Sequence, residues 1–498
     1  GLGVLDSAMV EACCFVASRL NDPRDAIFIN AVAAEDKGNH ILNVVRSGEY
    51  RGVDLSTFSS IPDSPFAYWA HDELRKLFST KKSLLESGFR VRQGLGSSDN
   101  FRFLRAWWEV SFEKVGFGKK WCSYAKGGGY MPFWGDQDLL VLWSDDGREI
   151  KQFSAHLYGS WSKQITNVQY YGRKGLTYSS RTSSEFSPRI FPVDCAFDTK
   201  GSCIFDETGQ DDDLRLIKLL AIIQSRIFRS LVNMCVATSG DTARSYSEAL
   251  IEKMPIPELS SIDESRLQEV KRLIRINMGG ERYIETTHSF SLPKLKGSQV
   301  TDLLKKLDEE VIAAKALYNT ALDELDLCVA RAYGIEDNIF QSVVETPRHH
   351  YSISEELPLS SVAIVCEMLS WCVGIVFGRF DWQLATGERA APSESELFDP
   401  LPAKSPGMLQ DGVAPFHAHE GILVDDQGHP HDLARLTEEV LARVDVTVPD
   451  DIRRWLQRDF FAYHLQRYSK SRRKAPIYWP LSTTSGSYTL WVYYTSLT

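Results

Sequence analysis

Basic, aromatic and hydroxyl side chains are interleaved at two places in this sequence. Gln169–Arg181 reads QYYGRKGLTYSSR, and Arg467–Lys474 reads RYSKSRRK, with five positive charges in eight residues. Arginine and lysine bind phosphates or guanine edges, hydroxyl groups bond phosphate oxygens, and glycines let a backbone approach closely. Both stretches fit contact with DNA or, equally well, a solvated basic surface, and the second stretch suits phosphate contacts that ignore base sequence. The residues that we predict to contact DNA are Lys126, Tyr171, Arg173, Lys174, Tyr178, Arg181, Arg467, Lys470, Arg472, Arg473 and Lys474.

Two carboxylates and a lysine near the N-terminus form a weaker pattern. Asp25 follows Pro-Arg, and Glu35 and Lys37 flank a second aspartate, which loosely matches a metal-binding pattern of nucleases. Such groups can hold Mg²⁺ and a water molecule. The same residues also fit the turns of a surface hairpin, which is the favoured interpretation. A magnesium-dependent nuclease of a restriction system stays open as an alternative function.

Other motifs for catalysis or cofactor binding are missing from the sequence. GLGVLD is not GxGxxG, and KGGGY lacks a following Lys-Ser/Thr, so neither is a phosphate loop. There is no F-x-G-x-G cofactor turn, no nucleophile elbow and no NPPY-type tetrapeptide; Asp63–Phe66 (DSPF) lacks the second proline. No catalytic or cofactor-binding residue is therefore predicted.

Four histidines lie in one acidic region of the chain. HxH pairs can bind metal, but these lie among prolines and glycines with no cysteine nearby, which favours a solvated loop. No metal ligand is predicted from them. They are His417, His419, His429 and His431.

Charge is distributed unevenly along the chain. The formal net charge is −10, and residues 381–451 hold fifteen acidic and four basic residues, which excludes a uniformly basic nucleic-acid coat. This stretch is rich in proline, glycine and aspartate, so an extended acidic insert is predicted over residues 385–449. It could mimic DNA charge, repel misaligned DNA or bind a basic partner. A non-catalytic scaffold that binds DNA or protein is therefore a second alternative.

Length and composition fit an ordinary globular protein of about three or four domains. The 498 residues are 43% apolar and 24% charged, and no run of about 20 apolar residues is present, which excludes a membrane span. Nine cysteines without a CxxC pair indicate reduced thiols, and no signal peptide is seen, so a cytoplasmic location is expected. The sequence begins without methionine, which suggests a piece of a longer protein.

Short strands and long helices must position these residues. Residues 93–207 are rich in glycine and aromatic residues and predict a β-rich module. The heptad pattern of Ser298–Tyr333 predicts a long helix that packs on another helix and ends at Gly334. The other expected strands and helices are a hairpin of Val10–Ser18 with Ala26–Val32, helices over Leu74–Leu85, Asp212–Ala237, Ser265–Asn277 and Asp450–Ser469, and strands at Leu139–Trp143, Gly175–Ser180, Arg189–Val193 and within Ala475–Tyr494.

Seven strings, in order along the chain, resemble one family. Together they are similar to the C-terminal part of adenine-specific DNA methyltransferases of the PglX type, from the BREX and DISARM phage-defence systems, which are related to type IIG restriction–modification enzymes. The resemblance covers nearly the whole chain except the acidic insert. The strings are Ile61–Trp69, Gly94–Val110, Lys126–Trp143, Gly175–Pro192, Ile222–Met234, Arg244–Pro257 and Gln466–Trp479.

The resemblance implies an α+β multidomain fold. Residues 1–92 would be the end of a Rossmann-like methyltransferase domain with a connector. Residues 93–260 would form a β-rich target-recognition domain. Residues 261–350 would be a helical spacer that contains the heptad helix, and residues 351–498 a mixed C-terminal domain that carries the acidic insert.

The resemblance also implies methyl transfer from S-adenosylmethionine to adenine N6 in duplex DNA, with cofactor and catalytic motifs upstream of this chain. An enzyme that modifies a base must flip it from the stack, so it needs a separate surface to select and hold the duplex. This chain would supply that surface, and other phage-defence proteins are expected as partners.

Overall fold

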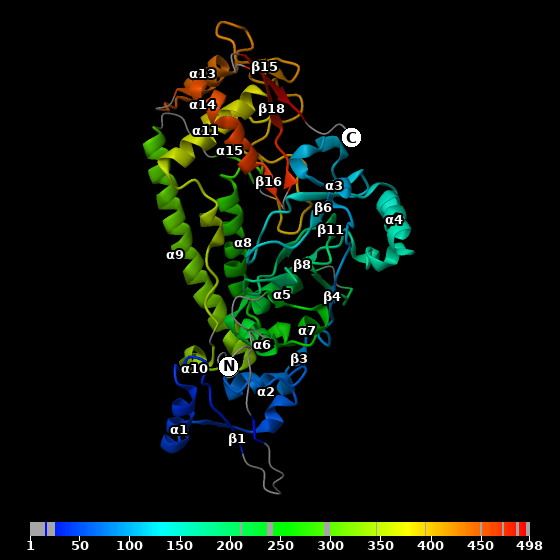
Figure 1. Cartoon of the computed structure of the whole chain (residues 1–498), viewed down its shortest axis with the longest axis vertical. Helices are drawn as coiled ribbons and strands as arrows, with labels where there is room; N and C mark the ends of the chain where they lie inside the picture. The colour runs from blue at the N-terminus through cyan, green and yellow to red at the C-terminus, as the bar shows by residue number, and fades with distance from the viewer. Residues whose placement is uncertain are drawn as a thin grey trace.

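The computed structural model shows an elongated molecule of mixed helices and strands (Figure 1). Helix α1 lies at one end, the C-terminal helices and strands lie at the other, and the long helix α9 runs along one side. The residues that the structure describes are 15–16, 25–209, 212–236, 243–292, 299–344, 346–393, 395–448, 451–470, 473–484 and 488–494. No helix in these ranges is both long and apolar enough to cross a membrane.

The N-terminal part is built from small elements. Strand β1 (Ala26–Phe28) pairs antiparallel with β2 (Arg51–Val53), and α1 (Lys37–Ser47) lies between them. The first arm of the predicted hairpin lies mostly outside the described residues. Helix α2 (Asp72–Thr80) ends earlier than predicted, because β3 (Lys82–Ser83) follows and pairs with Pro255–Ile256 (β14).

Two four-stranded sheets form the centre of the molecule. The first is antiparallel throughout, in the order β10-β8-β12-β4, and the second has the order β11-β6-β7-β5 with β11 and β6 parallel. The three predicted strands are confirmed as β7, β8 and β10 with shorter bounds. The strands are β4 (Phe89–Arg92), β5 (Leu104–Ala106), β6 (Trp121–Ala125), β7 (Leu139–Leu142), β8 (Gly175–Thr177), β10 (Arg189–Phe191), β11 (Cys195–Phe197) and β12 (Cys203–Asp206).

Helix α4 (Ser144–Tyr158) interrupts the β-rich region, and the sequence interpretation missed it. The turn predicted after β7 is present, because Asp145, Asp146 and Gly147 all have positive φ angles, of 51°, 54° and 71°. The chain becomes helical directly after this turn. Because these residues are typical of a turn between strands, strand patterns alone do not predict a helix here.

Two helices take the place of the single long helix predicted over Asp212–Ala237. Helix α5 (Asp213–Gln224) and helix α6 (Arg226–Cys235) meet at Ser225, whose extended ψ of 152° breaks the helical path. The Ser225 hydroxyl accepts from the Phe228 amide at 3.2 Å and caps α6. Serine at this place therefore starts a new helix and does not continue the first one.

The heptad prediction is confirmed. Helix α9 (Val300–Tyr333) spans 34 residues and ends at Gly334, which has a φ of 86°. It packs against α8 (Leu267–Glu281) and α11 (Ser361–Val376). Apolar side chains at three- and four-residue spacing, such as Leu307 and Leu325, are buried along the contact.

The acidic segment is folded, which corrects the expectation of an extended insert. Strand β15 (Ile422–Val424) pairs with β19 (Thr489–Tyr493), which also pairs with β18 (Tyr478–Ser482). Helix α13 (Leu433–Val444) packs on α11. Its apolar residues recur at helical spacing and are buried, while its charged residues face outward, so high acidity did not prevent packing.

The remaining elements are short. The helix predicted over Asp450–Ser469 is two helices, α14 (Ile452–Arg458) and α15 (Phe460–Arg467). The others are α3 (Asn100–Phe103), α7 (Glu248–Glu252), α10 (Asp337–Val343), α12 (Trp382–Thr386), β9 (Arg181–Thr182), β13 (Arg244–Ser245), β16 (Ser469–Lys470) and β17 (Arg473–Lys474).

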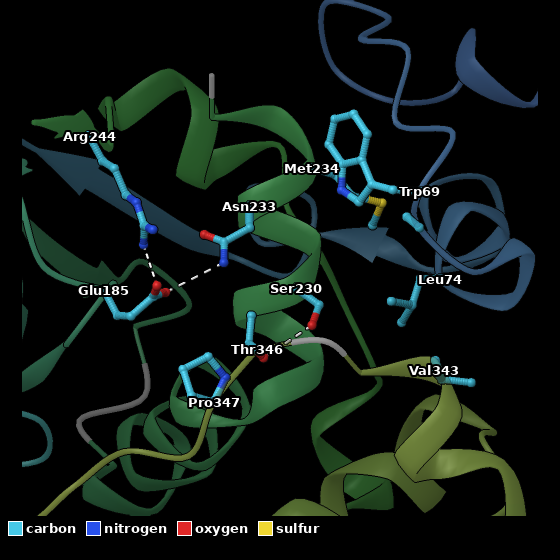
Figure 2. A pocket seen from close by; sticks show the side chains of 11 residues that line it. Trp69, Leu74, Glu185, Ser230, Asn233, Met234, Arg244, Val343, Thr346 and Pro347 are labelled. Atoms are coloured by element: carbon cyan, nitrogen blue, oxygen red, sulfur yellow. Dashed lines mark hydrogen bonds and ion pairs between the residues drawn. The ribbon is translucent and has the colours of Figure 1, made fainter. Parts of the chain in front are cut away.

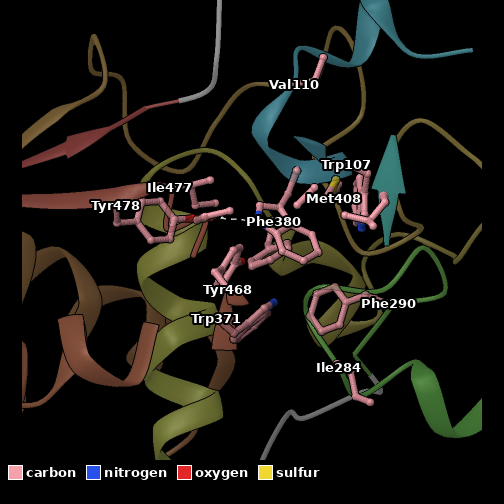
Figure 3. Packing of buried hydrophobic residues seen from close by; sticks show 14 of the residues in the cluster. Trp107, Val110, Ile284, Phe290, Trp371, Phe380, Met408, Tyr468, Ile477 and Tyr478 are labelled. Atoms are coloured by element: carbon pink, nitrogen blue, oxygen red, sulfur yellow. Dashed lines mark hydrogen bonds between the residues drawn. The ribbon is translucent and has the colours of Figure 1, made fainter. Parts of the chain in front are cut away.

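Two hydrophobic cores hold the elements together. The first crosses the boundaries expected at residues 260 and 350, and the second crosses those at 92, 260 and 350. In the first core, Trp107 and Tyr468 pack near Phe380 although they come from distant segments (Figure 3). The Trp107 indole donates to the Thr286 carbonyl at 2.8 Å, and the Trp108 indole donates to the Ala475 carbonyl at 3.0 Å. The β-rich module is thus anchored to the spacer and to the C-terminal strands.

Candidate nucleic-acid interface

Strand β8 separates two groups of predicted DNA contacts. It runs antiparallel to β12, with Thr177 opposite Cys203. The residues before β8 therefore lie beside the end of β12, and those after it lie beside its start. Arg173 and Lys174 are at one end of this pair of strands, and Arg181 is at the other. Residues that are close in sequence are thus divided between two surfaces.

The cations before β8 are engaged in ion pairs. Arg173 Nη1 lies 3.2 Å from Glu207 Oε1, and its Nη2 donates to the Asp206 carbonyl at 3.0 Å. Lys174 Nζ lies 2.6 Å from Asp213 Oδ1. A DNA phosphate at this end would have to compete with these carboxylates.

The two predicted tyrosines are buried. Tyr171 is 6% exposed and donates its hydroxyl proton to the Thr166 carbonyl at 2.9 Å. Tyr178 is 0% exposed and packs against Phe186. Their rings fill the core of the β-rich module, so neither phenol presents a surface to a duplex in this structure.

Three backbone segments meet at the other end of β8, and we call them the loop face: Lys126–Gly129, Ser179–Arg181 and Thr199–Lys200. The Ser180 amide donates to the Lys200 carbonyl at 2.9 Å, and the Ser179 hydroxyl donates to the Gly128 carbonyl at 2.9 Å. Arg181 and Lys200 are exposed and Lys126 is half-buried. Among the residues that the structure describes, none of these three cations forms an ion pair.

Glycine is required where the loop face is tightest. Gly127 has a φ of 74°, and a Cβ added there would lie 2.7 Å from the Lys200 carbonyl oxygen. A Cβ at Gly201 would lie 2.6 Å from the Gly127 nitrogen. Only residues without a side chain let these two segments approach, so the glycines bring Lys126 and Lys200 together. The sequence interpretation found Lys126 and missed Lys200, whose place depends on this long-range contact.

The electrostatics of the loop face are those of a cationic patch. Burial lowers the pKa of the Lys126 ammonium, and the nearby Asp198 opposes this effect. Asp198 itself is occupied, because its Oδ1 accepts from the Lys200 amide at 2.7 Å. The patch therefore keeps positive charge that no carboxylate in the described residues pairs directly.

Two cations of the C-terminal basic segment (Arg467–Lys474) bind carboxylates within the fold. Arg467 forms an ion pair with Glu367, and the two side chains are 19% and 13% exposed. Lys470 Nζ lies 3.5 Å from Asp138 Oδ2. Both cations are predicted to contact DNA phosphates, and in this structure both attach the C-terminal elements to neighbouring parts of the chain.

The rest of this segment is divided. Arg473 Nε lies 2.6 Å from Glu109 Oε2, and Nη2 lies 2.8 Å from Glu109 Oε1, which is a bidentate pair. Lys474 is exposed. Arg472 lies outside the described residues. Of the described cations in this segment, Lys474 alone lacks an ion pair with a carboxylate of the described chain.

A cavity of about 290 Å³ adjoins the loop face through the β9–β13 pair (Figure 2). One wall is polar: Arg244 forms an ion pair with Glu185, and Asn233 Nδ2 donates to the same carboxylate at 3.4 Å. The opposite wall is apolar and includes Trp69 and Met234. The charges of this wall balance each other, so the cavity adds little to the cationic character of the loop face.

The residues of the nuclease hypothesis have local structural roles. Asp36 caps helix α1 by accepting from the Asn39 amide at 2.9 Å, and Lys37 donates to the Ala34 carbonyl at 3.1 Å. Asp25 lies directly before strand β1, which pairs with β2, and Lys37 begins helix α1, where the hairpin interpretation expected a turn. Across the described parts of the chain, no three histidine, cysteine or carboxylate side chains are arranged to hold a metal ion.

The four histidines bind one another and the backbone. His417 Nε2 lies 2.8 Å from His431 Nδ1, and the ring of His419 accepts from the Gly421 amide at 2.8 Å. All four are half-buried, which differs from the predicted solvated loop. Burial lowers the pKa of His417 and of His419, which favours neutral rings packed against each other.

The glycines of the string Gly94–Gly96 lie too close to other protein segments to hold S-adenosylmethionine. A Cβ at Gly94 would lie 1.9 Å from the Phe197 carbonyl oxygen, and one at Gly96 would lie 2.8 Å from Gln164 Oε1. These glycines allow protein segments to approach each other and leave no space for a cofactor.

Comparisons with known proteins find two curated methyltransferases to which this chain is similar. No family model matches it. It is 24% identical to the adenine-specific methyltransferase BrxX of Escherichia coli O9:H4 (strain HS), over 90% of this chain and 38% of that protein. It is 23% identical to the adenine-specific methyltransferase PglX of Lacticaseibacillus casei (strain Zhang), over 86% of this chain and 36% of that protein.

The chain thus spans little more than a third of the length of these curated relatives. Both matches extend over nearly all of this chain and carry the same enzyme description. They confirm the resemblance that the seven strings indicate: the chain is a relative of the PglX-like adenine-specific methyltransferases.

Proposed function

We propose that this chain is the DNA-recognition and C-terminal portion of a site-specific adenine methyltransferase that modifies duplex DNA in bacterial phage defence. Both relatives are named adenine-specific methyltransferases. The observation that carries the proposal is the loop face, where Lys126, Arg181 and Lys200 converge without ion pairs among the described residues.

The loop face suits a duplex because of how its charges are held. Phosphate binding gains free energy when it releases counter-ions from DNA, and this requires cations that are not already neutralised. The chain as a whole carries a net charge of −10, so DNA would be attracted only where positive charge is concentrated locally. Arg173, Lys174 and the C-terminal basic segment meet this requirement less well, because most of their charges are paired.

In the complete enzyme, S-adenosylmethionine would be held by another part of the protein and would supply the methyl group. The residues of this chain would bind the duplex and fix its position while the target adenine leaves the stack. The cytoplasm would be the site of this work, and other proteins of the defence system would be partners.

The proposal is tested by charge reversal on the loop face. Lys126→Glu, Arg181→Glu and Lys200→Glu are combined, and binding to a fluorescent 30-base-pair duplex is measured by anisotropy between about 50 and 300 mM salt. If each cation contacts one phosphate, the slope of log K against log salt should fall by roughly 2 to 3. Affinity at the lowest salt should fall at least tenfold.

Three lysines on helix α9 provide the matched control. Lys305, Lys306 and Lys315 are exposed, and their combined reversal to glutamate changes net charge by the same amount. This control should keep a salt slope close to that of the unmodified chain. Equal loss in both triple variants would mean that only net charge matters and would refute the loop face as the contact surface.

A further inference from the structure

A buried arginine lies beside the glycine-rich segment of the loop face, Lys126–Gly129. Arg189 on β10 is 2% exposed. Its guanidinium forms no hydrogen bond or ion pair with any residue that the structure describes, and its Nη1 is enclosed without a partner. An uncompensated charge at such a position is unfavourable unless a ligand of opposite charge binds to it.

Two glycines make room for this side chain. A Cβ at Gly135 would lie 3.1 Å from Arg189 Cδ, and one at Gly128 would lie 3.9 Å from Arg189 Nη2. The side chain therefore passes Gly135 and ends beneath Gly128. Because Gly128 has no side chain, Nη2 of the guanidinium lies close to the loop backbone, on the side where a Cβ would stand.

The loop above the guanidinium has free hydrogen-bond donors. Among the described residues, the amides of Gly127, Gly128 and Gly129 donate no hydrogen bond. Gly127 and Gly128 have positive φ angles of 74° and 152°, and consecutive backbone amides that donate to no protein group can donate to a bound anion. The side chains of Lys126 and Lys200 flank the same loop. Buried and exposed positive charge and unpaired amides therefore occur together at one place.

We propose that Gly127–Gly129 and Arg189 form a binding site for one phosphate group, with Lys126 and Lys200 at its rim. This inference deepens the proposed function and rests on it in one respect: the phosphate in the complete enzyme would be a phosphodiester of the bound duplex. Burial lowers the pKa of Arg189 to about 10, which still leaves the guanidinium charged at neutral pH. A bound phosphate would supply the missing counter-charge.

Calorimetric titration with inorganic phosphate tests the site directly, in chloride buffer at constant ionic strength. The unmodified chain should bind one phosphate per molecule. Arg189→Met should weaken this binding at least tenfold, since it removes a charged hydrogen-bond donor. Lys305→Met on helix α9 should leave it unchanged.

Arg189→Met also separates a binding role from a structural one. If the arginine only supported the fold, its loss would lower the thermal midpoint in chloride buffer. If it holds a ligand, removing an unpaired buried charge should leave the midpoint in chloride the same or higher, and should abolish the rise that phosphate produces. Lys200→Met, which leaves the buried charge in place, gives a second reading and should weaken phosphate binding by a smaller factor.

A parallel titration with the 30-base-pair duplex identifies the source of the phosphate. Weaker binding of both duplex and inorganic phosphate by Arg189→Met supports a phosphodiester site. If Arg189→Met binds inorganic phosphate more weakly but binds the duplex as before, the anion site is supported and its ligand is a free phosphorylated molecule. This result would count against the proposed DNA contact. Unchanged phosphate binding by Arg189→Met would overturn the site, whatever the duplex does.

Discussion

The loop face and the C-terminal basic segment contain the same kinds of side chains, but their charges are in opposite states. The cations of the loop face form no ion pairs among the described residues, whereas Arg467, Lys470 and Arg473 each bind a carboxylate. A sequence records how many charges a segment has. The fold decides which of them remain free, and only those can exchange counter-ions with DNA at low cost.

The difference arises from where each segment lies. Strands β16 and β17 fold back onto the β-rich module, where Glu109 receives both donors of Arg473. Arg467 meets Glu367 on helix α11 between packed elements. In the loop face, glycines allow two backbone segments to lie against each other, and the side chains of Lys126 and Lys200 flank this contact. The C-terminal basic segment uses its positive charges to attach elements of the fold to each other. The loop face keeps its positive charges for a ligand.

The largest expected effect is on stability and comes from Arg467. Replacing it with methionine would leave the Glu367 carboxylate buried without its partner. Breaking a buried ion pair in this way costs about 3 to 5 kcal/mol. Arg467→Met should therefore lower the free energy of unfolding by about that amount in urea denaturation. Lys474→Met, in the same segment but exposed, should change it by about 0.5 kcal/mol or less; similar losses in both variants would erase the distinction between paired and free cations.

The carboxyl group of Glu285 gives the paired region a characteristic pH dependence. Burial raises its pKa to about 7 from the ordinary 4.5, the neighbouring Glu367 adds to this, and Arg467 opposes it. Between pH 4.5 and 7 the folded protein keeps a proton that the unfolded chain releases. The contribution of this group therefore lowers stability as pH rises through that range, and the full penalty applies above pH 7.

Glu285→Gln should remove this penalty. Its stability relative to the unmodified chain should increase between pH 5 and pH 8, by up to about 3 kcal/mol. Urea denaturation at the two pH values measures the difference, with Lys474→Met as a variant whose relative stability should be the same at both. Parallel stabilities of Glu285→Gln and the unmodified chain across this range would show that the group titrates normally.

The elements that sequence reasoning predicted well have local signals. The seam of helix α9 repeats every three or four residues and stops at Gly334, so its bounds follow from periodicity and a glycine alone. Strands β7, β8 and β10 follow from short alternating runs in a region rich in glycine and aromatic residues. Helix α4 was missed because three residues of positive φ precede it, and α13 because acidic composition was given more weight than its apolar face.

The state of the candidate site could not be read in the same way, because it depends on residues far apart in the chain. Nothing in the sequence near Arg473 indicates Glu109, which lies 364 positions away. Lys200 joins Lys126 only because Gly127 and Gly201 allow their segments to touch. Long-range pairing of this kind decides which cations are free.

A smaller effect is expected from the glycines that assemble the loop face. Gly127→Ala places a side chain at a φ of 74° and 2.7 Å from the Lys200 carbonyl oxygen, which should cost about 1 to 2 kcal/mol of stability. It should also weaken duplex binding by moving Lys126 away from Lys200. Gly279→Ala, on helix α8 and outside the loop face, is the control, because a Cβ there also meets nothing within 4 Å. Equal behaviour of the two variants would show that the close approach of these segments is unimportant.

The smallest effect separates Lys126 from an ordinary surface lysine. Burial lowers its pKa, so as pH rises it should lose its charge before an ordinary lysine and stop contributing to phosphate binding. Arginine stays charged over the same range. Between pH 7.5 and 9.5 the duplex affinity of the unmodified chain should fall relative to that of Lys126→Arg, by at most roughly fivefold, the value of one phosphate contact near 0.15 M salt. Lys200→Arg is the control: Lys200 is exposed, so this variant shows how replacing a lysine by arginine alone changes the pH dependence of duplex affinity. If its pH profile matches that of Lys126→Arg, then the half-buried position of Lys126 has no bearing on how the loop face holds DNA.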